Sequence, residues 1–222
     1  MSSTSALEKD DTARSNRSAV SRELLFKFLI VGDYGVGKTA IVRRYTEGQF
    51  SSNYKITIGA DFSIKSLQWD EQTKINLQLW DIAGHERFGY MTRVYYKYAV
   101  AAAVVFDVSR IQTFQSVSKW LSDLREKVTL HDGTPVPVVL LANKCDIQGI
   151  DIATDTIVRF CSDNKIEAWF VTSAKENINI EEAMTFLVDK VIHFKAQETN
   201  NDAIMLQETR PQNNKYKASC CG

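Results

Sequence analysis

The chain has 222 residues, of which 44% are hydrophobic and 24% charged, a composition that suits one globular domain with additional terminal segments. Lys and Arg together number 27, as do Asp and Glu, so the formal net charge is zero. The lack of a basic excess argues against a general nucleic-acid binder and against attachment to an anionic membrane by charge alone.

The two ends of the chain differ in composition from its middle. Residues 1–22 are rich in Ser and Thr and predict a disordered leader, and residues 197–222 predict a flexible tail. One domain is therefore expected over residues 23–196. The sequence contains no run of 18 apolar residues, no apolar signal-peptide core and no myristoylation glycine after Met1. The four cysteines form no disulfide framework, which suggests a reducing compartment; they are Cys145, Cys161, Cys220 and Cys221.

The first half of the domain alternates between strand and helix patterns. Residues 24–31 form an apolar run interrupted only by Lys27, which predicts a strand buried on both faces, as in a parallel sheet. A helix is expected at residues 38–47. Residues 60–69 and 74–80 predict an antiparallel hairpin, because the second segment alternates apolar and polar residues and a short polar turn joins the two.

The second half repeats the alternation. Strands are expected at residues 101–106, 136–142 and 168–171, with a helix around residues 154–161 between the last two. Two further helices are indicated by apolar stripes that predict core packing, the last with a capping pattern of Asn179 and Glu182. The stripes are Phe114, Val117, Trp120, Leu121, Leu124 and Val128, then Ala183, Met184, Leu187, Val188, Val191 and Phe194. The sum is an α/β fold with a six-stranded, mainly parallel sheet, one antiparallel strand and helices on both faces.

A phosphate-binding motif follows the first strand. Residues 32–39, Gly-Asp-Tyr-Gly-Val-Gly-Lys-Thr, match G-x-x-x-x-G-K-[ST] between a strand and a helix. Glycines let the backbone wrap around an anion, and successive N–H groups at a helix start point at phosphate oxygens. Lys38 lies in the first helical turn, where the helix dipole disfavours a cation unless a bound anion is its partner. The alternative is a Gly-rich turn with an exposed Lys.

Three more polar segments follow strands. They are residues 80–84, 143–146 and 172–175. Ligands of open α/β sheets bind beyond the carboxyl ends of the strands, so all four segments are expected to line one rim. Each of the three segments alone could equally be a polar turn.

Together and in this order, these segments resemble the guanine-nucleotide motifs of the Ras superfamily of small GTPases, over about residues 23–196. The resemblance implies a P-loop NTPase small G domain that binds GTP/GDP with Mg²⁺ and hydrolyses GTP. It implies that Lys38 contacts the β- and γ-phosphates and that Mg²⁺ is held by Thr39, by Asp81 through a water and, when the γ-phosphate is present, by Thr57. The remaining nucleotide contacts are expected from Gly35, Val36, Gly37, Ala40, Phe50, Tyr54, Gly84, Asn143, Lys144, Asp146, Ser173, Ala174 and Lys175.

Base selection and catalysis also follow from the resemblance. Asn143 and Asp146 would read guanine, because a carboxylate accepts bonds from the guanine N1–H and amine, a donor pair that adenine lacks. The expected catalytic residues are Lys38, Thr57, Gly84 and His85. This base reader favours GTP over ATP and so argues against a P-loop small-molecule kinase, for which no acceptor-binding segment is found.

His85 and Tyr34 depart from the family pattern. His85 stands where the family carries the Gln that orients the attacking water, and Tyr34 adds bulk near the γ-phosphate. Both suggest slow intrinsic hydrolysis. Rab-directed activating proteins of the TBC type supply an Arg and a Gln in trans, so His85 still permits cycling. The alternative is a largely GTP-locked adaptor that recruits effectors.

Within the superfamily, residues 58–62, 80–88 and 93–96 resemble the Rab family. Phe62, Trp80 and Tyr95 match the aromatic triad that Rab effectors contact, although aromatic core packing is an alternative. Ile82 and residues 91–97 and 139–146 resemble the Rab branch that serves lysosome-related organelles, phagosomes and melanosomes.

The segment Ser219-Cys220-Cys221-Gly222 resembles the Rab double cysteine that receives two geranylgeranyl chains. Two chains give the stable anchoring that one does not; free thiols are the alternative. The partners implied are an exchange factor, a TBC-type activating protein, a GDP-dissociation inhibitor or escort protein, switch-binding effectors and a membrane, but no nucleic acid. The expected location is the cytoplasmic face of vesicles, phagosomes or lysosome-related organelles, with a cytosolic pool.

Overall fold

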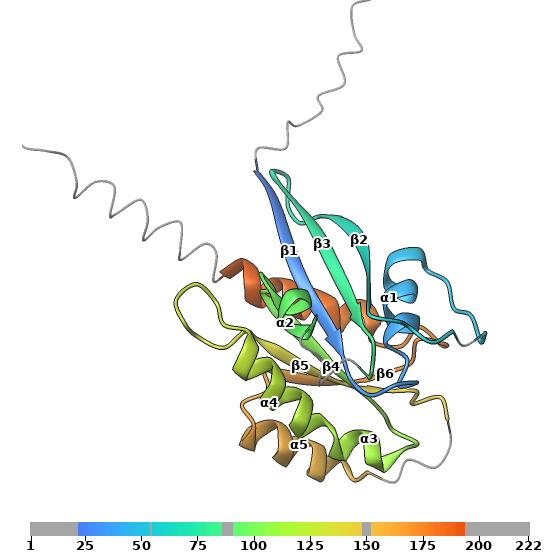
Figure 1. The fold of residues 1–222 in the computed structure, drawn as a ribbon. Coiled ribbons are helices and arrows are strands. Elements are labelled where there is room, and N and C mark those ends of the chain that lie inside the picture. The colour runs from blue at the N-terminus through green and yellow to red at the C-terminus, as the bar shows by residue number, and fades with distance from the viewer. Residues whose placement is uncertain (1–21, 54, 86–90, 148–151, 194–222) are drawn as a thin grey trace, which may run out of the picture.

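A computed structural model describes residues 22–53, 55–85, 91–147 and 152–193 (Figure 1). The strands are β1 (Arg22–Val31), β2 (Ala60–Gln68), β3 (Thr73–Ile82), β4 (Ala101–Asp107), β5 (Val138–Asn143) and β6 (Ala168–Thr172). The helices are α1 (Lys38–Glu47), α2 (Met91–Tyr96), α3 (Ile111–Gln115), α4 (Val117–Lys127), α5 (Thr154–Asp163) and a last helix described over residues 180–193.

The strands form one six-stranded sheet in the order β2-β3-β1-β4-β5-β6. Only the edge strand β2 is antiparallel, and it pairs with β3 in the predicted hairpin. β4 and β5 are buried along their whole length because both sheet faces are covered, as their continuous apolar runs predict. The predicted α/β architecture is therefore confirmed.

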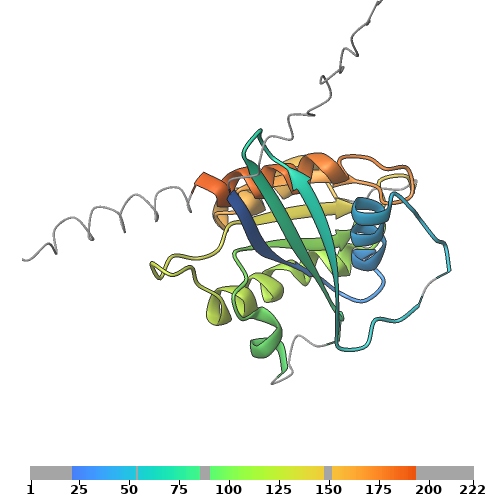
Figure 2. The ribbon, with the colours of Figure 1, turned by 90° about the horizontal axis from the view of Figure 1, so that it is seen from above.

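Two apolar cores lie on opposite faces of the sheet. Side chains of α2 to α5 pack on one face around Phe106 and Trp120. Side chains of α1 and the last helix pack on the other around Phe28, Ile41 and Met184. Figure 2 shows the last helix, in orange, on the opposite side of the sheet from α4. This arrangement leaves the carboxyl ends of the parallel strands open for a ligand.

Several boundaries differ from the sequence predictions. Arg22 belongs to β1, not to the leader expected over residues 1–22, because its N–H donates to the Gln72 carbonyl at 3.0 Å and extends the ladder. The helix expected after β4 is divided at Ser116 into α3 and α4, although Ser116 itself keeps helical dihedrals. The six-residue α2 was not predicted, since it is too short to show helical periodicity.

Asn179 directly precedes the last helix, as its capping pattern predicts, but its side-chain amide donates to the Val171 carbonyl at 2.7 Å. None of the helices in the described part of the chain is long and apolar enough to cross a membrane. The predictions for the leader up to residue 21, for Phe194 and for the tail lie outside the described residues.

Candidate functional site

The P-loop joins β1 to α1 and depends on its glycines. Gly37 has a φ of 101°, and a Cβ atom on it would lie 2.4 Å from Nδ2 of Asn143. Gly84, which follows β3, lies so close to the loop that its Cβ would be 2.2 Å from the backbone nitrogen of Tyr34. Only glycine fits at such positions, so the loop is packed tightly between β3 and β5.

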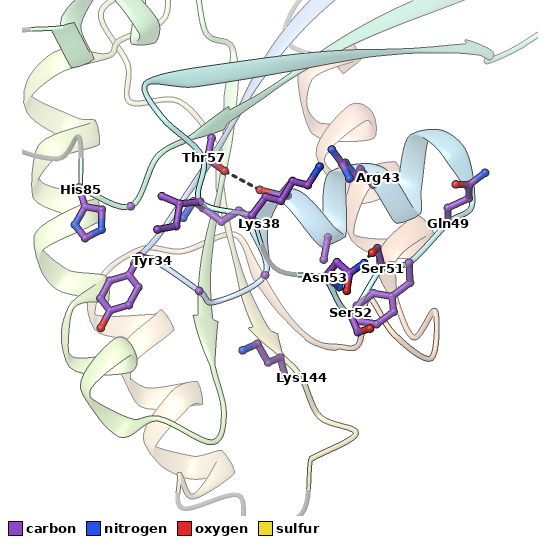
Figure 3. A pocket seen from close by; sticks show the side chains of 18 residues that line it. Tyr34, Lys38, Arg43, Gln49, Ser51, Ser52, Asn53, Thr57, His85 and Lys144 are labelled. Atoms are coloured by element: carbon purple, nitrogen blue, oxygen red, sulfur yellow. Dashed lines mark hydrogen bonds between the residues drawn. The ribbon is translucent and has the colours of Figure 1, made fainter.

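Lys38 lies at the centre of the loop (Figure 3). Its side chain is only 5% exposed, and its amine donates to the carbonyls of Gly32 at 2.9 Å and Asp33 at 3.0 Å. Burial lowers the pKa of Lys38 to about 8, although the negative charges of Asp81 and Asp33 oppose that shift. A buried amine within a loop of this shape is suited to a phosphate group.

Three side-chain oxygens from separate segments meet beside Lys38. Thr39 Oγ1 lies 3.0 Å from Thr57 Oγ1 and also donates to Asp81 Oδ2. Figure 3 shows Thr57 beside Lys38, with a dashed line for its hydrogen bond. Thr57 Oγ1 donates to the same Asp81 oxygen at 3.3 Å. The other oxygen, Asp81 Oδ1, is buried without a hydrogen-bond partner among the described residues, and burial raises the pKa of Asp81. Two hydroxyl oxygens and a carboxylate with one unpartnered oxygen are a set of ligands that fits Mg²⁺.

Asn143 connects three segments of the rim. Its side chain is 1% exposed, and Nδ2 donates to the Val36 carbonyl of the P-loop at 2.8 Å. Its Oδ1 accepts a hydrogen bond from Thr172 Oγ1 at 3.3 Å. The amide nitrogen and the amide oxygen of Asn143 therefore both make contacts within the protein, which fix the orientation of this side chain at the rim.

Asp146 lies next to the loop after β6. Asp146 Oδ1 accepts a 2.6 Å hydrogen bond from Ser173, and its Oδ2 lies 3.9 Å from the amine of Lys175. Arg44 of α1 holds the same loop by donating to the carbonyls of Ala174 at 2.8 Å and Lys175 at 3.0 Å. The predicted base-side residues are thus brought together, with Asp146 oriented by neighbours on both sides.

Asp107, at the end of β4, was not singled out from the sequence. Its buried carboxylate lies 2.7 Å from the amine of Lys144 and 3.0 Å from Nε of Arg110. Arg110 in turn donates to the Tyr34 carbonyl at 3.1 Å. Burial raises the pKa of Asp107, but hydrogen bonds from Lys144 and Ser109 outweigh it and hold that pKa below its usual value. The sequence did contain a signal for Asp107, because this carboxylate stands at the end of a strand with a continuous apolar run.

Tyr34 and His85, the two departures from the family pattern, are in contact. Their rings stack with centroids 5.1 Å apart and planes 16° apart, and Figure 3 shows them together at one end of the cleft. The guanidinium carbon of Arg110 lies 5.9 Å from the centroid of the Tyr34 ring. The two side chains therefore form one aromatic unit beside the P-loop.

A cleft of about 250 Å³ follows the P-loop. Ten predicted residues line it, namely Gly35, Gly37, Lys38, Thr39, Ala40, Phe50, Thr57, Gly84, His85 and Lys144. Seven further lining residues, from α1 and the segment after it, were not predicted from the sequence; they are Arg43, Gln49, Ser51, Ser52, Asn53, Lys55 and Ile56. Val36 and Asp81 are buried behind the lining, and Tyr54 lies outside the described residues.

The predicted effector triad forms a continuous aromatic surface. Phe62 stacks on Trp80 at 5.6 Å between ring centroids, and Trp80 meets Tyr95 at 6.3 Å. Phe62 is 51% exposed, which a purely structural aromatic cluster would not require. The amine of Lys27 lies 3.7 Å from the Trp80 ring centroid and makes a cation–π contact with one face of that ring.

A family model and several known proteins match the sequence of this chain over most of its length. The family model described as the Ras family matches residues 27–193. The chain is 53% identical to human Ras-related protein Rab-32 over 208 residues, which cover 90% of this chain and 91% of that protein. It is 47% identical to Rab-32B of Dictyostelium discoideum, with coverage of 89% and 77%, and 47% identical to human Rab-7L1, with coverage of 84% and 95%.

Proposed function

The chain belongs to the Ras family and, within it, to the Rab GTPases of membrane trafficking, and from this premise we propose that it is a switch set by its bound nucleotide. It hydrolyses GTP to GDP and phosphate and uses Mg²⁺. In the proposed cycle, GTP orders the segments around Thr57 and Gly84, and hydrolysis releases them. The observation that carries this proposal is the meeting of Thr39, Thr57 and Asp81 beside the buried amine of Lys38.

The phosphates would be held by the P-loop. The backbone N–H groups of Gly35, Val36, Gly37 and Ala40 would donate to phosphate oxygens at the start of α1. Lys38 would exchange its contacts with the Gly32 and Asp33 carbonyls for the β- and γ-phosphates, which offer the negative charge that a buried amine lacks.

The oxygens of Thr39, Thr57 and Asp81 would hold Mg²⁺, whose charge would neutralise part of the phosphate charge when bound. The unused Asp81 Oδ1 supports this assignment, because a buried carboxylate oxygen is costly without a partner. Thr57 is contributed by the segment before β2, so its participation ties that segment to the nucleotide.

The guanine base would be read by Asp146 and flanked by Lys144 and Phe50. Ser173, Ala174 and Lys175 would contact the guanine carbonyl from the neighbouring loop. The hydrogen bond from Ser173 fixes the orientation of Asp146, and the Asp107 carboxylate does the same for Lys144. Asn143 would act chiefly by holding the Val36 carbonyl of the P-loop.

Intrinsic hydrolysis is proposed to be slow because His85 replaces the usual Gln and stacks on Tyr34. The stack on Tyr34, with ring centroids 5.1 Å apart, restricts how the His85 ring can turn its nitrogens toward an attacking water molecule. Even Ras, with its Gln, turns over at a rate on the order of 10⁻⁴ s⁻¹ without an activating protein.

Single-turnover GTP hydrolysis tests this proposal. We expect His85→Gln to hydrolyse GTP several-fold faster than wild type, and Tyr34→Ala to give a smaller increase by freeing His85. Tyr34→Phe is the matched control because it keeps the stack and should keep the wild-type rate. A wild-type rate equal to or above that of His85→Gln would contradict the proposal.

The second candidate is a largely GTP-locked adaptor, which the Tyr34–His85 stack also favours. The two candidates differ in their response to a TBC domain that supplies Arg and Gln in trans. A large acceleration of GTP turnover by such a domain supports the cycling switch, and no acceleration supports the adaptor.

For membrane attachment we propose geranylgeranylation of Cys220 and Cys221, with an exchange factor, a TBC-type activating protein, an escort or dissociation inhibitor and effectors as partners. The proposed location is the cytoplasmic face of vesicles, phagosomes or lysosome-related organelles, with a cytosolic pool. A fluorescent fusion with both cysteines changed to Ser should become diffuse, whereas the wild-type fusion should label membranes. Membrane labelling by the variant would overturn the lipidation proposal.

A further inference from the structure

A second cleft, of about 600 Å³, lies away from the nucleotide site. It is called the distal groove here, and its apolar lining includes Leu25, Trp80, Tyr98, Leu130 and Val191. Leu25 precedes Gly32 of the P-loop by seven residues of β1, which correspond to roughly 23 Å along a strand. The distal groove is therefore a surface distinct from the nucleotide cleft.

The distal groove combines exposed apolar side chains with positive charge. Tyr98 is 78% exposed and Leu25 is 61% exposed, although both carry large, mainly apolar side chains. The positive charge comes from Lys27 and Lys97, His131 adds a polar ring, and none of the described lining residues of the groove is acidic. Such a surface suits an apolar segment with flanking carboxylates.

The chain itself supplies a segment of this kind. Beyond His193, the last residue of the described helix, the sequence contains one run of three large apolar residues, Ile204-Met205-Leu206. Asp202 and Glu208 flank this run.

The segment between His193 and the apolar run contains enough residues to reach the groove. Val191 of the groove lies two residues before His193, so the described part of the last helix ends near the groove. The ten residues between His193 and Ile204 could extend over roughly 35 Å.

We propose that residues 202–208 bind in the distal groove of the same chain, with the apolar run against Leu25 and Tyr98 and the flanking carboxylates facing Lys97 and His131. A tethered segment acts at an effective concentration in the millimolar range, so a weak contact suffices to populate the bound form. Trp80 belongs both to the groove and to the aromatic triad, so a docked segment and a partner bound at the triad would hinder each other.

Amide NMR spectra of the full-length, unlipidated chain test the proposal. The variant combines Ile204→Ser, Met205→Ser and Leu206→Ser, and the control combines Gln212→Ser, Asn213→Ser and Asn214→Ser. We expect the variant to shift the amide signals of Leu25, Tyr98 and Leu130 at least threefold more than the control does. Shifts no larger than those of the control would overturn the proposal.

A second measurement approaches the contact from the groove. Leu25→Ser and Tyr98→Ala change largely exposed side chains, so the domain should stay folded. Each should lower the heteronuclear NOE of Met205 to the value found for Asn214, and an unchanged value would count against intramolecular docking. Variant-dependent shifts that disappear on tenfold dilution would show that a second copy occupies the groove, which would also overturn the proposal.

Discussion

At the scale of single residues, Asp107 is the carboxylate that joins the two halves of the nucleotide rim. It pairs with Lys144 on the base side and with Arg110, which holds the Tyr34 carbonyl on the phosphate side. Neutralising it leaves two cations without their shared partner while preserving the shape of the side chain.

We therefore expect Asp107→Asn to lower the free energy of unfolding by about 1–3 kcal/mol and to speed GDP release about tenfold. Denaturant unfolding and displacement of a fluorescent GDP analogue measure the two effects. Glu167→Gln is the control, since its partner Lys190 lies at a half-exposed site 3.0 Å away, and it should change stability by less than about 1 kcal/mol. Equal effects of both variants would contradict the role given to Asp107.

The same residue predicts a pH dependence. Because the folded pKa of Asp107 is lowered, its stabilisation is fully present above the unfolded pKa of about 3.9 and is lost as pH falls through the folded value. The difference in free energy of unfolding between wild type and Asp107→Asn should be constant above about pH 5 and shrink below about pH 4. A difference that grows on acidification would show that another group carries the effect.

At the scale of elements, α1 begins and ends on glycines with left-handed dihedrals. Gly37 has a φ of 101° and Gly48 a φ of 69°, so an Ala at either position costs about 1–2 kcal/mol of backbone strain. Only at Gly37 would the new Cβ also meet a neighbour, Nδ2 of Asn143, whereas nothing lies within 4 Å of it at Gly48.

Comparing the two substitutions isolates the packing of the P-loop. Gly37→Ala should cost about 1–2 kcal/mol more than Gly48→Ala, because the Asn143–Val36 hydrogen bond is lost, and it should speed GDP release more than tenfold. Gly48→Ala should leave release within about twofold of wild type, because its space is open. Thermal unfolding and stopped-flow nucleotide release measure these effects, and similar values for both variants would argue against the contact.

Some features of these elements could be predicted from the sequence and others could not. The P-loop, the hairpin and the parallel strands were predictable, because a spaced motif and hydrophobic periodicity are local properties of the chain. The stack of Tyr34 on His85 and the pairing of Asp107 with Lys144 were not, because each joins segments that only the sheet order brings together. The role of Asn143 was read from the motif as base recognition, while its bond to Val36 depends on the packing of β5 against the loop.

At the scale of the whole molecule, the proposed Mg²⁺ donor set connects three parts of the fold. Thr39 comes from α1, Thr57 from the segment before β2 and Asp81 from β3. These parts are adjacent because β1 pairs with β3 in the centre of the sheet. A ligand that bridges them should therefore stabilise the domain as a unit.

A ligand at about 1,000 times its Kd adds about 4 kcal/mol to the free energy of unfolding, so GDP with Mg²⁺ should raise Tm by roughly 8–16 °C for a domain of this size. Removing Mg²⁺ with EDTA at the same GDP concentration should lower Tm, and ATP should give no comparable rise if Asp146 selects guanine as proposed. Thr39→Ala should remove the response to EDTA. Thr46→Ala is the matched control, because that hydroxyl lies on the same helix and donates to the Val42 carbonyl at 2.9 Å, away from Asp81, so its response should match wild type. If Tm in GDP is unaffected by EDTA in the wild-type chain, or if both threonine variants lose the response, then Thr39, Thr57 and Asp81 do not form the metal site.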